Sequence, residues 1–403
     1  MKDAPIASVR LGFAEPPEEP LTPDTFPSKI GGKPAWLNPE HVLEVDRVRC
    51  GVCDKPMSFL LQLYTPEDEP AEAYHRMVYM FCCRNGACLK KEWQKCVKVF
   101  RSQLPRLNPY WSDNESSSSN ARSSEDSEDD VDEEEEEECK PRRRAKFSNP
   151  AKTCVVCGLR GGKTCSKCHT ASYCSRDHQL YHWSTAMHRQ LCGKSEGEML
   201  ERERALEEKL LAKSTFPEFE IVDEEEDSNR KLDEYGNLVQ ELDGVQITEE
   251  ANADEAGEGE SKALVPVGDE AYEETEVDVD KAFLKFQKRI QTYPDQILRY
   301  ARVEYQLPLP DPLWASDSGR PDIERDIGRC AHCGGERTFE FQVMPQLLTF
   351  LGIDHSHTDA LDFGTLIVYS CKDNCHAPHQ PLVEEAVWLQ NFSEDGMKLG
   401  KDA

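Results

Sequence analysis

The sequence predicts an α+β, β-rich fold in which one discontinuous domain is built from two similar halves. Three observations lead to this prediction. A cysteine pair followed by alternating apolar residues occurs near each end of the chain, a dense Cys/His block lies between the two pairs, and two acidic stretches separate these regions. Repeated units that match one another favour a single domain. Two independent small domains are the alternative.

The overall composition restricts packing to part of the 403 residues. Hydrophobic residues make up 38% of the chain, and charged residues reach 31%. Globular chains usually contain about 45–50% apolar residues. The net charge is −29. Such a chain repels the phosphate backbone of nucleic acids and favours a basic partner, although the charge could equally serve solubility alone.

The cysteine content indicates metal binding. The chain has 17 cysteines, its first residues lack the apolar core of a signal peptide, and no apolar run is long enough to span a bilayer. We therefore expect the cytoplasm and nucleus, with no membrane association. In such reducing compartments, paired cysteines usually hold metal rather than form disulfides.

Shifts in composition divide the chain into five segments. Residues 1–111 and 281–403 carry the strand-like patterns and form the two halves of the β-rich domain. Residues 151–193 are the Cys/His block. Residues 112–150 are Ser-rich, then almost purely acidic, and end in a basic cluster, whereas residues 194–280 hold a charged helix and a second acidic stretch. The second acidic stretch runs from about Val222 to Val279. Neither acidic stretch can bury enough apolar surface to offset the entropy of ordering, so we expect both to be disordered.

Two helices are expected outside the strands. The segment GEMLERERALEEKLLAK pairs Glu with Lys or Arg at i,i+4 spacing, which predicts a charged, solvated helix after the Cys/His block. In KAFLKFQKRIQTYPDQILRY, Phe283, Phe286 and Ile290 recur at i, i+3 and i+7. This spacing predicts an amphipathic helix that is kinked or ends near Pro294.

The internal repeat relates the two halves residue by residue. Each half has a cysteine pair, a phenylalanine six residues later, a glutamine three residues further and a closing cysteine. These residues are Cys50, Cys53, Phe59, Gln62 and Cys88 in the first half, and Cys330, Cys333, Phe339, Gln342 and Cys375 in the second. Before the closing cysteine each half has an apolar run that ends in cysteine, MVYMFC or LIVYSC. Aromatic and β-branched enrichment favours strands in both halves.

The central block has the ligand spacing of two zinc sites. It follows C-x2-C-x7-C-x2-C-x5-C-x3-H-x9-H-x3-C, with Cys154, Cys157, Cys165, Cys168, Cys174, His178, His188 and Cys192 at these positions. Zinc takes four Cys or His ligands, so eight ligands suit two ions. Since so short a block has almost no other core, zinc binding, worth about 10–16 kcal/mol in finger peptides, would supply its folding energy. The alternative is that these are reduced core cysteines. His182 could replace His178 as a ligand or lie at the surface.

The flanking halves predict one further zinc site each. The C-terminal set is Cys330, Cys333, Cys371 and Cys375. The N-terminal set is Cys50, Cys53 and Cys88 with either Cys82 or Cys83, and we assign Cys82, although Cys96 also competes. All of these sites are closed by protein ligands, which is typical of structural rather than catalytic zinc.

The central block resembles the MYND zinc finger, whose ligands alternate between two zinc ions. By that resemblance Cys154, Cys157, Cys174 and His178 hold one ion, and Cys165, Cys168, His188 and Cys192 hold the other. MYND fingers more often have cysteine where His178 stands. They bind short proline-containing peptides through a glutamine and a tryptophan after the sixth ligand. Gln179 and Trp183 match those positions, and could instead pack against the helix.

The resemblance extends to both flanking halves. The segments LGFAEP, FPSKIGGKPAWL, CGVCDKPMSFLLQLY, FCCRNGAC and VFRSQLPR resemble the N-terminal half of the programmed cell death protein 2 family, and CAHCGGERTFEFQVMPQLL and FGTLIVYSC resemble its C-terminal half. The chain is similar to the branch that carries a MYND finger. The expected fold is therefore a discontinuous β-rich domain of two zinc-containing halves, with an inserted MYND finger and acidic disordered linkers.

The family resemblance implies a non-enzymatic function. Members resemble dedicated chaperones for one ribosomal protein of the small subunit, of the universal S-five family (S-two in eukaryotes), and support 40S assembly. The alternative is a MYND-mediated scaffold or transcriptional co-regulator that affects proliferation or apoptosis. In the chaperone reading, Phe59, Gln62, Phe339 and Gln342 either line the client surface or pack beneath it.

Other function classes find little support in the sequence. The chain has no Gly-rich phosphate loop, nucleophile elbow or HExxH motif, so we expect no enzyme. Asp354, His355 and His357 fit a polar loop better than a site. Direct DNA binding is not expected, because the finger lacks a basic recognition helix. The basic cluster 141–146 could serve nuclear import or balance the acidic run before it, and Ser123, Ser124 and Ser127 are candidate acidophilic-kinase sites.

Overall fold

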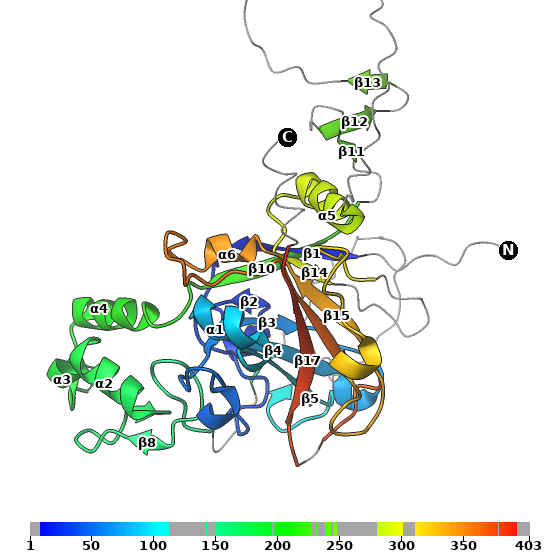
Figure 1. Cartoon of the computed structure of the whole chain (residues 1–403). Coiled ribbons are helices and arrows are strands. Elements are labelled where there is room, and N and C mark those ends of the chain that lie inside the picture. Colours follow the sequence, from blue (N-terminus) through cyan, green and yellow to red (C-terminus); the bar gives the residue numbers. More distant parts are fainter. Residues whose placement is uncertain are drawn as a thin grey trace, which may run out of the picture.

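The structure is a computed structural model that combines helices and strands around one closed, ten-stranded barrel (Figure 1). It describes residues 9–112, 142–143, 150–195, 197–227, 231–232, 238–242, 245–247, 280–300, 311–377 and 379–392. The candidate kinase sites and most of both acidic stretches lie outside these residues. None of the helices within them is long and apolar enough to cross a bilayer.

The barrel joins strands from both ends of the chain. Its order is β1-β10-β2-β3-β4-β5-β17-β16-β15-β14, and all neighbours are antiparallel. The strands are β1 (Arg10–Glu15), β2 (Lys29–Ile30), β3 (Ser58–Tyr64), β4 (His75–Cys82), β5 (Val97–Leu104), β10 (Phe219–Glu225), β14 (Leu298–Tyr300), β15 (Arg337–Val343), β16 (Thr365–Cys371) and β17 (Leu382–Gln390). Strands that precede the Cys/His block pair with strands that follow it: β10 lies between β1 and β2, β5 pairs with β17, and β1 pairs with β14.

The remaining elements are short helices, single turns and small sheets of two or three strands. The helices are α1 (Gly86–Glu92), α2 (Arg176–Ser184), α3 (His188–Leu191), α4 (Glu201–Ala212), α5 (Lys281–Thr292) and α6 (Leu347–Phe350). Single turns occur at η1 (Pro23–Thr25), η2 (Val45–Val48), η3 (Ala71–Ala73), η4 (Trp93–Lys95) and η5 (Ile323–Ile327). Short strands pair as β6 (Trp111–Ser112) with β7 (Arg142–Arg143), β8 (Lys163–Thr164) with β9 (Ser172–Tyr173), and β11 (Lys231–Leu232) with β12 (Leu238–Leu242) and β13 (Val245–Ile247).

Both predicted helices are confirmed. Helix α4 has no buried residue, as its charged sequence indicates. Helix α5 begins after Asp280, whose carboxylate accepts a hydrogen bond from the backbone N–H of Phe283 at 2.9 Å, and it ends at Thr292, close to Pro294. Phe283 and Phe286 are buried on its apolar face, and both rings contact Phe392.

The second acidic stretch begins later than its composition predicts. Placing disorder from Val222 is wrong, because Val222 lies in β10, which pairs with β1 over six residues. Ile221 supplies the apolar face of this strand and is only 7% exposed. A strand needs just one apolar face, so Asp223, Glu224 and Glu225 stay exposed without preventing its formation. In the first linker, the predicted disorder also fails for the backbone of Arg142–Arg143, which pairs with Trp111–Ser112.

The Cys/His block packs directly against the barrel. The indole N–H of Trp36 donates to the carbonyl of Gly158 at 2.8 Å, and the backbone N–H of Arg160 donates to the carbonyl of Leu43 at 2.9 Å. Val156 and Leu159 belong to the same hydrophobic cluster as the barrel strands. The finger therefore shares its core with the barrel.

Candidate metal centres

The first ligand group of the finger brings together Cys154, Cys157, Cys174 and His178. Their ligand atoms all lie within 4.8 Å of one another. The sulfurs of Cys157 and Cys174 are 3.6 Å apart, and Nδ1 of His178 lies 3.5 Å from Sγ of Cys154. A tetrahedral zinc ion, with zinc–sulfur bonds of about 2.3 Å and zinc–nitrogen bonds of about 2.0–2.1 Å, separates its ligand atoms by about 3.5–3.8 Å. The donor set and its spacing therefore fit zinc.

Helix α2 orients the histidine of this group. Ser175 caps the helix, and its hydroxyl accepts a hydrogen bond from the backbone N–H of His178 at 3.2 Å. The neighbouring cysteines also affect the protonation of this histidine. Although burial alone lowers the pKa of His178, hydrogen bonds to Cys154 and Cys174 raise it to about 10.

The second ligand group consists of Cys165, Cys168, His188 and Cys192. Its ligand atoms again lie within 4.8 Å of one another. Sγ of Cys165 is 3.8 Å from Sγ of Cys192, and Sγ of Cys168 is 3.6 Å from Nε2 of His188. The short helix α3 carries His188 at its start and Cys192 just after its end. The structure thus gathers the two alternating sets that the MYND resemblance implies.

The C-terminal group lies at one end of β15 and β16. Cys330 and Cys333 form a tight turn before β15, in which the backbone N–H of Gly334 donates to the carbonyl of Cys330 at 2.9 Å. Cys371 ends β16, and Cys375 follows it. The sulfur pairs Cys330–Cys375 and Cys333–Cys371 are each 3.6 Å apart. All four predicted residues are therefore brought together, with the spacing that zinc requires.

An arginine from the N-terminal strands supports this C-terminal group. Arg101 of β5 is 1% exposed, and its Nε donates to Glu385 of β17 at 2.8 Å. Its Nη2 lies 3.6 Å from Sγ of Cys375, and Glu385 accepts from the backbone N–H of Cys371 at 3.2 Å. This pair was not predicted from the sequence. The only local signal was a charged residue inside the apolar pattern VKVFRSQL.

The N-terminal group requires a correction. Cys50, Cys53, Cys83 and Cys88 have ligand atoms within 4.8 Å of one another, so Cys83 rather than Cys82 completes the set. Adjacent residues of a strand point to opposite faces. Cys82 is the last residue of β4, is fully buried, and its thiol donates to the carbonyl of Cys83 at 3.4 Å. Cys96 remains at the edge of the group, with its sulfur 3.7 Å from that of Cys50.

His182 is a buried support for the finger, so the expectation of a surface residue is wrong. Its Nδ1 lies 2.9 Å from the hydroxyl of Tyr173, and its Nε2 lies 2.8 Å from the carboxylate of Glu207 on α4. His182, His188 and Glu207 also lie within 4.8 Å of one another. Because His188 already faces Cys168 and both nitrogens of His182 have partners, we assign this group to the docking of α4 on the finger.

A groove of about 460 Å³ opens beside the second finger group, and we call it the finger groove. Its lining residues are Lys163, Cys165, Ser166, Lys167, Tyr173, Arg176, Gln179, Leu180 and Trp183. The two residues expected to bind peptides, Gln179 and Trp183, both line it. Trp183 also packs edge-on against His188, with ring centroids 5.9 Å apart. Trp183 therefore both packs inside the finger, against His188, and lines the groove.

The repeated phenylalanines and glutamines do not line a surface. Phe59 and Phe339 are 5% and 8% exposed, and Gln62 and Gln342 are fully buried. Gln62 accepts a hydrogen bond from the backbone N–H of Ala35 at 2.8 Å. Of the two alternatives for these residues, lining a surface or packing in the core, the structure shows packing in the core.

The Asp354–His357 segment forms an exposed loop that packs on α1. The backbone N–H of Gly86 donates to the carbonyl of Asp359 at 3.0 Å, and Lys90 donates to the carbonyl of Thr358. His355 and His357 belong to none of the candidate metal groups among the described residues. Within that part of the chain, every cysteine is a free thiol.

Comparisons with known proteins cover both halves and the finger. Residues 8–118 match the family model described as programmed cell death protein 2, N-terminal domain, and residues 280–391 match the programmed cell death protein 2, C-terminal putative domain. Residues 154–192 match the MYND finger model. No solved structure matches the chain.

Full-length relatives carry the same family description. The chain is 34% identical over 394 residues to programmed cell death protein 2 of Rattus norvegicus, with 96% of this chain and 97% of the relative covered. It is 35% identical over 388 residues to the Bos taurus protein, with 95% and 96% covered. It is also 27% identical over 419 residues to programmed cell death protein 2-like of Homo sapiens, with 97% and 98% covered.

Proposed function

The chain belongs to the programmed cell death protein 2 family, and from this premise we propose that it is a non-enzymatic, zinc-dependent chaperone or adaptor. Its proposed client is a newly made ribosomal protein of the small subunit, from the universal S-five family (S-two in eukaryotes). Binding would protect this client until 40S assembly. The identity of the client rests on the family resemblance, whereas its basic character is supported by the charges of this chain.

One observation carries the proposal of a basic client. Strand β10 of the barrel presents Asp223, Glu224 and Glu225 as exposed side chains, in a chain whose net charge is −29. Complementary charge speeds encounter with a basic protein and competes with RNA for it. Asp223 and Glu225 lie on one face of the strand and Glu224 on the other, and Asp223 also pairs with Arg10.

The chemistry of the four cysteine-rich groups supports a structural role for metal. Each group supplies four protein ligands, so a bound zinc ion would have no open position for a substrate. We therefore propose four zinc ions, two in the finger and one in each flanking half. When bound, zinc supplies folding energy rather than catalysis. No enzyme family appears among the matched families.

We further infer that the barrel is made of two similar halves. The β3–β4 and β15–β16 pairs each have a register shift of one residue, between Phe59 and Leu61 and between Phe339 and Phe341. The side chain of Gln342 pairs with the backbone of Leu313, as Gln62 pairs with Ala35. Equivalent irregularities at equivalent positions support a common unit.

The proposal is tested by affinity purification of the tagged protein from growing cells, with and without arrest of translation. We expect one small-subunit ribosomal protein to be recovered in about equal amount with the bait and to decrease after arrest. The variant Asp223→Asn/Glu224→Gln/Glu225→Gln should recover less of it, while Asp46→Asn, an exposed change elsewhere on the chain, should recover the same amount. Absence of any ribosomal protein from the purification would reject the chaperone function.

The finger groove favours a second function, a MYND-mediated scaffold or transcriptional co-regulator. Gln179 and Trp183 line this groove at the positions that bind proline-containing peptides in MYND fingers. Such a scaffold would act in the cytoplasm and nucleus and would affect proliferation or apoptosis. The same purification tests it. Chromatin regulators that are lost from Trp183→Ala, without a ribosomal protein in the wild-type sample, would support the scaffold over the chaperone.

A further inference from the structure

The finger carries the opposite charge to the rest of the chain. Residues 151–193 contain six Lys or Arg side chains and one acidic side chain, Asp177, a formal charge of +5 within a chain of −29. Two zinc ions bound by three thiolates and one imidazole each would lower that charge by about one unit per site. The finger therefore stays positive when it holds metal, and its basic side chains need a separate explanation.

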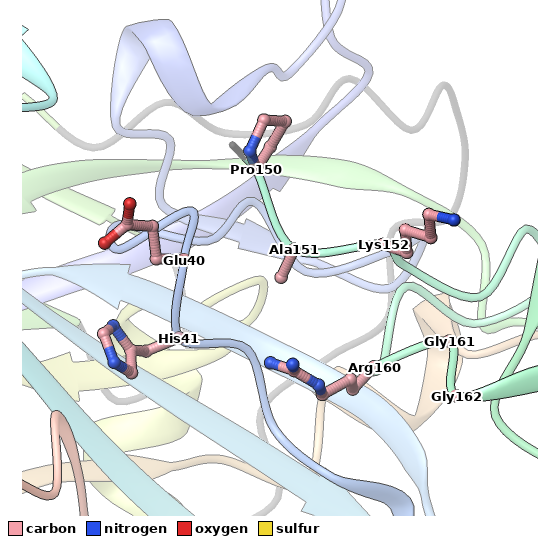
Figure 2. Close-up of a pocket in the computed structure, with 8 residues that line it drawn as sticks. All are labelled: Glu40, His41, Pro150, Ala151, Lys152, Arg160, Gly161 and Gly162. Atoms are coloured by element: carbon pink, nitrogen blue, oxygen red, sulfur yellow. The ribbon is translucent and has the colours of Figure 1, made fainter. Parts of the chain in front are cut away.

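Five of these six basic side chains line one of two grooves. Lys163, Lys167 and Arg176 line the finger groove. Lys152 and Arg160 line a second groove of about 450 Å³ at the junction with the barrel. Figure 2 shows that the segment with Glu40 and His41 lies beside the segment from Pro150 to Lys152 in this junction groove.

The two grooves differ in how their charges are balanced. In the junction groove, Arg160 pairs with Glu44 at 3.0 Å, and Glu40 contributes a carboxylate that accepts from Tyr110. The lining of the finger groove contains no acidic residue. Its three cations are exposed, and none of them pairs with an acid in the described part of the chain. The finger groove is thus the place where positive charge is left for a ligand.

We propose that the finger groove selects acidic, proline-containing segments of a partner protein. This inference rests on the proposed peptide-binding function of the finger and adds the charge of the peptide to it. Leu180, which is 51% exposed, and Trp183 offer an apolar surface for a proline ring. The three cations would then pair with Asp or Glu residues that flank the proline. Complementary charges of this kind increase both specificity and association rate.

A short acidic peptide fits this surface better than a nucleic acid does. Residues 151–193 carry a net positive charge, whereas the chain as a whole has a net charge of −29. At physiological ionic strength, salt screens the interaction between exposed charges that lie more than about 8 Å apart. A long polyanion would extend beyond the groove and meet the acidic remainder of the protein, while a peptide of a few residues would stay within the basic surface.

The test selects short, random proline-containing peptides from a displayed library with the zinc-loaded full-length protein. We expect the bound peptides to be enriched in Asp and Glu beside proline. The variant Lys163→Glu/Lys167→Glu/Arg176→Glu should bind one such labelled peptide about tenfold more weakly in fluorescence anisotropy, since three exposed ion pairs contribute about 0.5 kcal/mol each. Arg189→Glu, which lies outside both grooves, should bind normally.

Each outcome has a distinct meaning. Native mass spectrometry of both variants checks that the zinc content is unchanged, so that loss of binding reports the groove rather than the fold. Peptides bound without charge preference would overturn this inference and leave the peptide-binding function intact. If no peptide binds at all, the peptide-binding function itself fails. A labelled RNA that binds more tightly than every selected peptide, and is lost in the triple variant, would overturn the inference in favour of a nucleic-acid ligand.

Discussion

The adjacent cysteines Cys82 and Cys83 show what sequence spacing can and cannot decide at the residue scale. In the C-terminal half, no neighbouring cysteine competes with Cys371, and the predicted set is the set that the structure gathers. In the N-terminal half, Cys82 ends a strand and Cys83 follows it directly, so the two side chains point in different directions. Which face meets Cys50 and Cys53 depends on tertiary packing, so spacing alone left the choice open and the assignment of Cys82 failed.

Serine substitutions separate the two cysteines experimentally. We expect Cys83→Ser to lose one zinc ion in native mass spectrometry, because it removes a ligand from the N-terminal group. Cys82→Ser should retain that ion and destabilise the fold by about 1 kcal/mol, the scale of one buried polar change, since the serine hydroxyl can still donate to the carbonyl of residue 83. The reverse result, with zinc lost only from Cys82→Ser, would restore the original assignment.

The buried pair of Arg101 and Glu385 gives a second prediction at this scale. Arg101→Met should destabilise the protein by about 3 kcal/mol in urea denaturation, because it removes the nearer of the two arginines that pair with the buried carboxylate of Glu385 and leaves only Arg337, at 3.4 Å. It should also weaken zinc retention by the C-terminal group, since the guanidinium approaches Cys375. The double variant Arg101→Met/Glu385→Leu should recover much of the stability, because the buried carboxylate that has lost its nearer partner is removed as well. If the single and the double variant lose the same stability, the buried charge is not the cause of the destabilisation.

Strand β10 shows the limit of composition at the scale of the element. Its carboxylates predicted disorder, yet a barrel strand forms because it pairs with β1 and buries Ile221. By contrast, α4 and α5 were predicted correctly, since helices are specified by local periodicity. Strand pairing between segments more than 200 residues apart leaves no comparable local signal.

Two substitutions in β10 test whether it is a barrel strand in solution. Ile221→Asn should destabilise the protein by about 2–4 kcal/mol, because it removes a buried side chain and places an amide among apolar groups. Glu224→Gln, an exposed change in the same strand, should alter stability by less than about 0.5 kcal/mol. Thermal unfolding measures both. If the two variants behave alike, β10 does not contribute to the folded barrel.

At the scale of the whole molecule, the sequence indicated the strands but not their closure into a barrel. The repeated cysteine pairs and apolar runs predicted β3, β4, β15 and β16, and all four form. The seams between the two ends of the chain, β5 with β17 and β1 with β14, join strands with no shared motif. Closure follows from the cost of exposed strand edges, which only the assembled sheet removes.

Closure predicts that the two ends of the chain hold together without a continuous backbone. A protease site inserted between Ser124 and Glu125 would divide the chain before the finger. After cleavage, the pieces should elute together from a size-exclusion column, because the β5–β17 and β1–β14 seams are supported by the fully buried pair of Arg76 and Glu340. Denaturant should separate them in one transition. The alternative that the sequence allows is two independent small domains, which would separate in native buffer once the linker is cut. Uncleaved protein with the same insertion serves as the control.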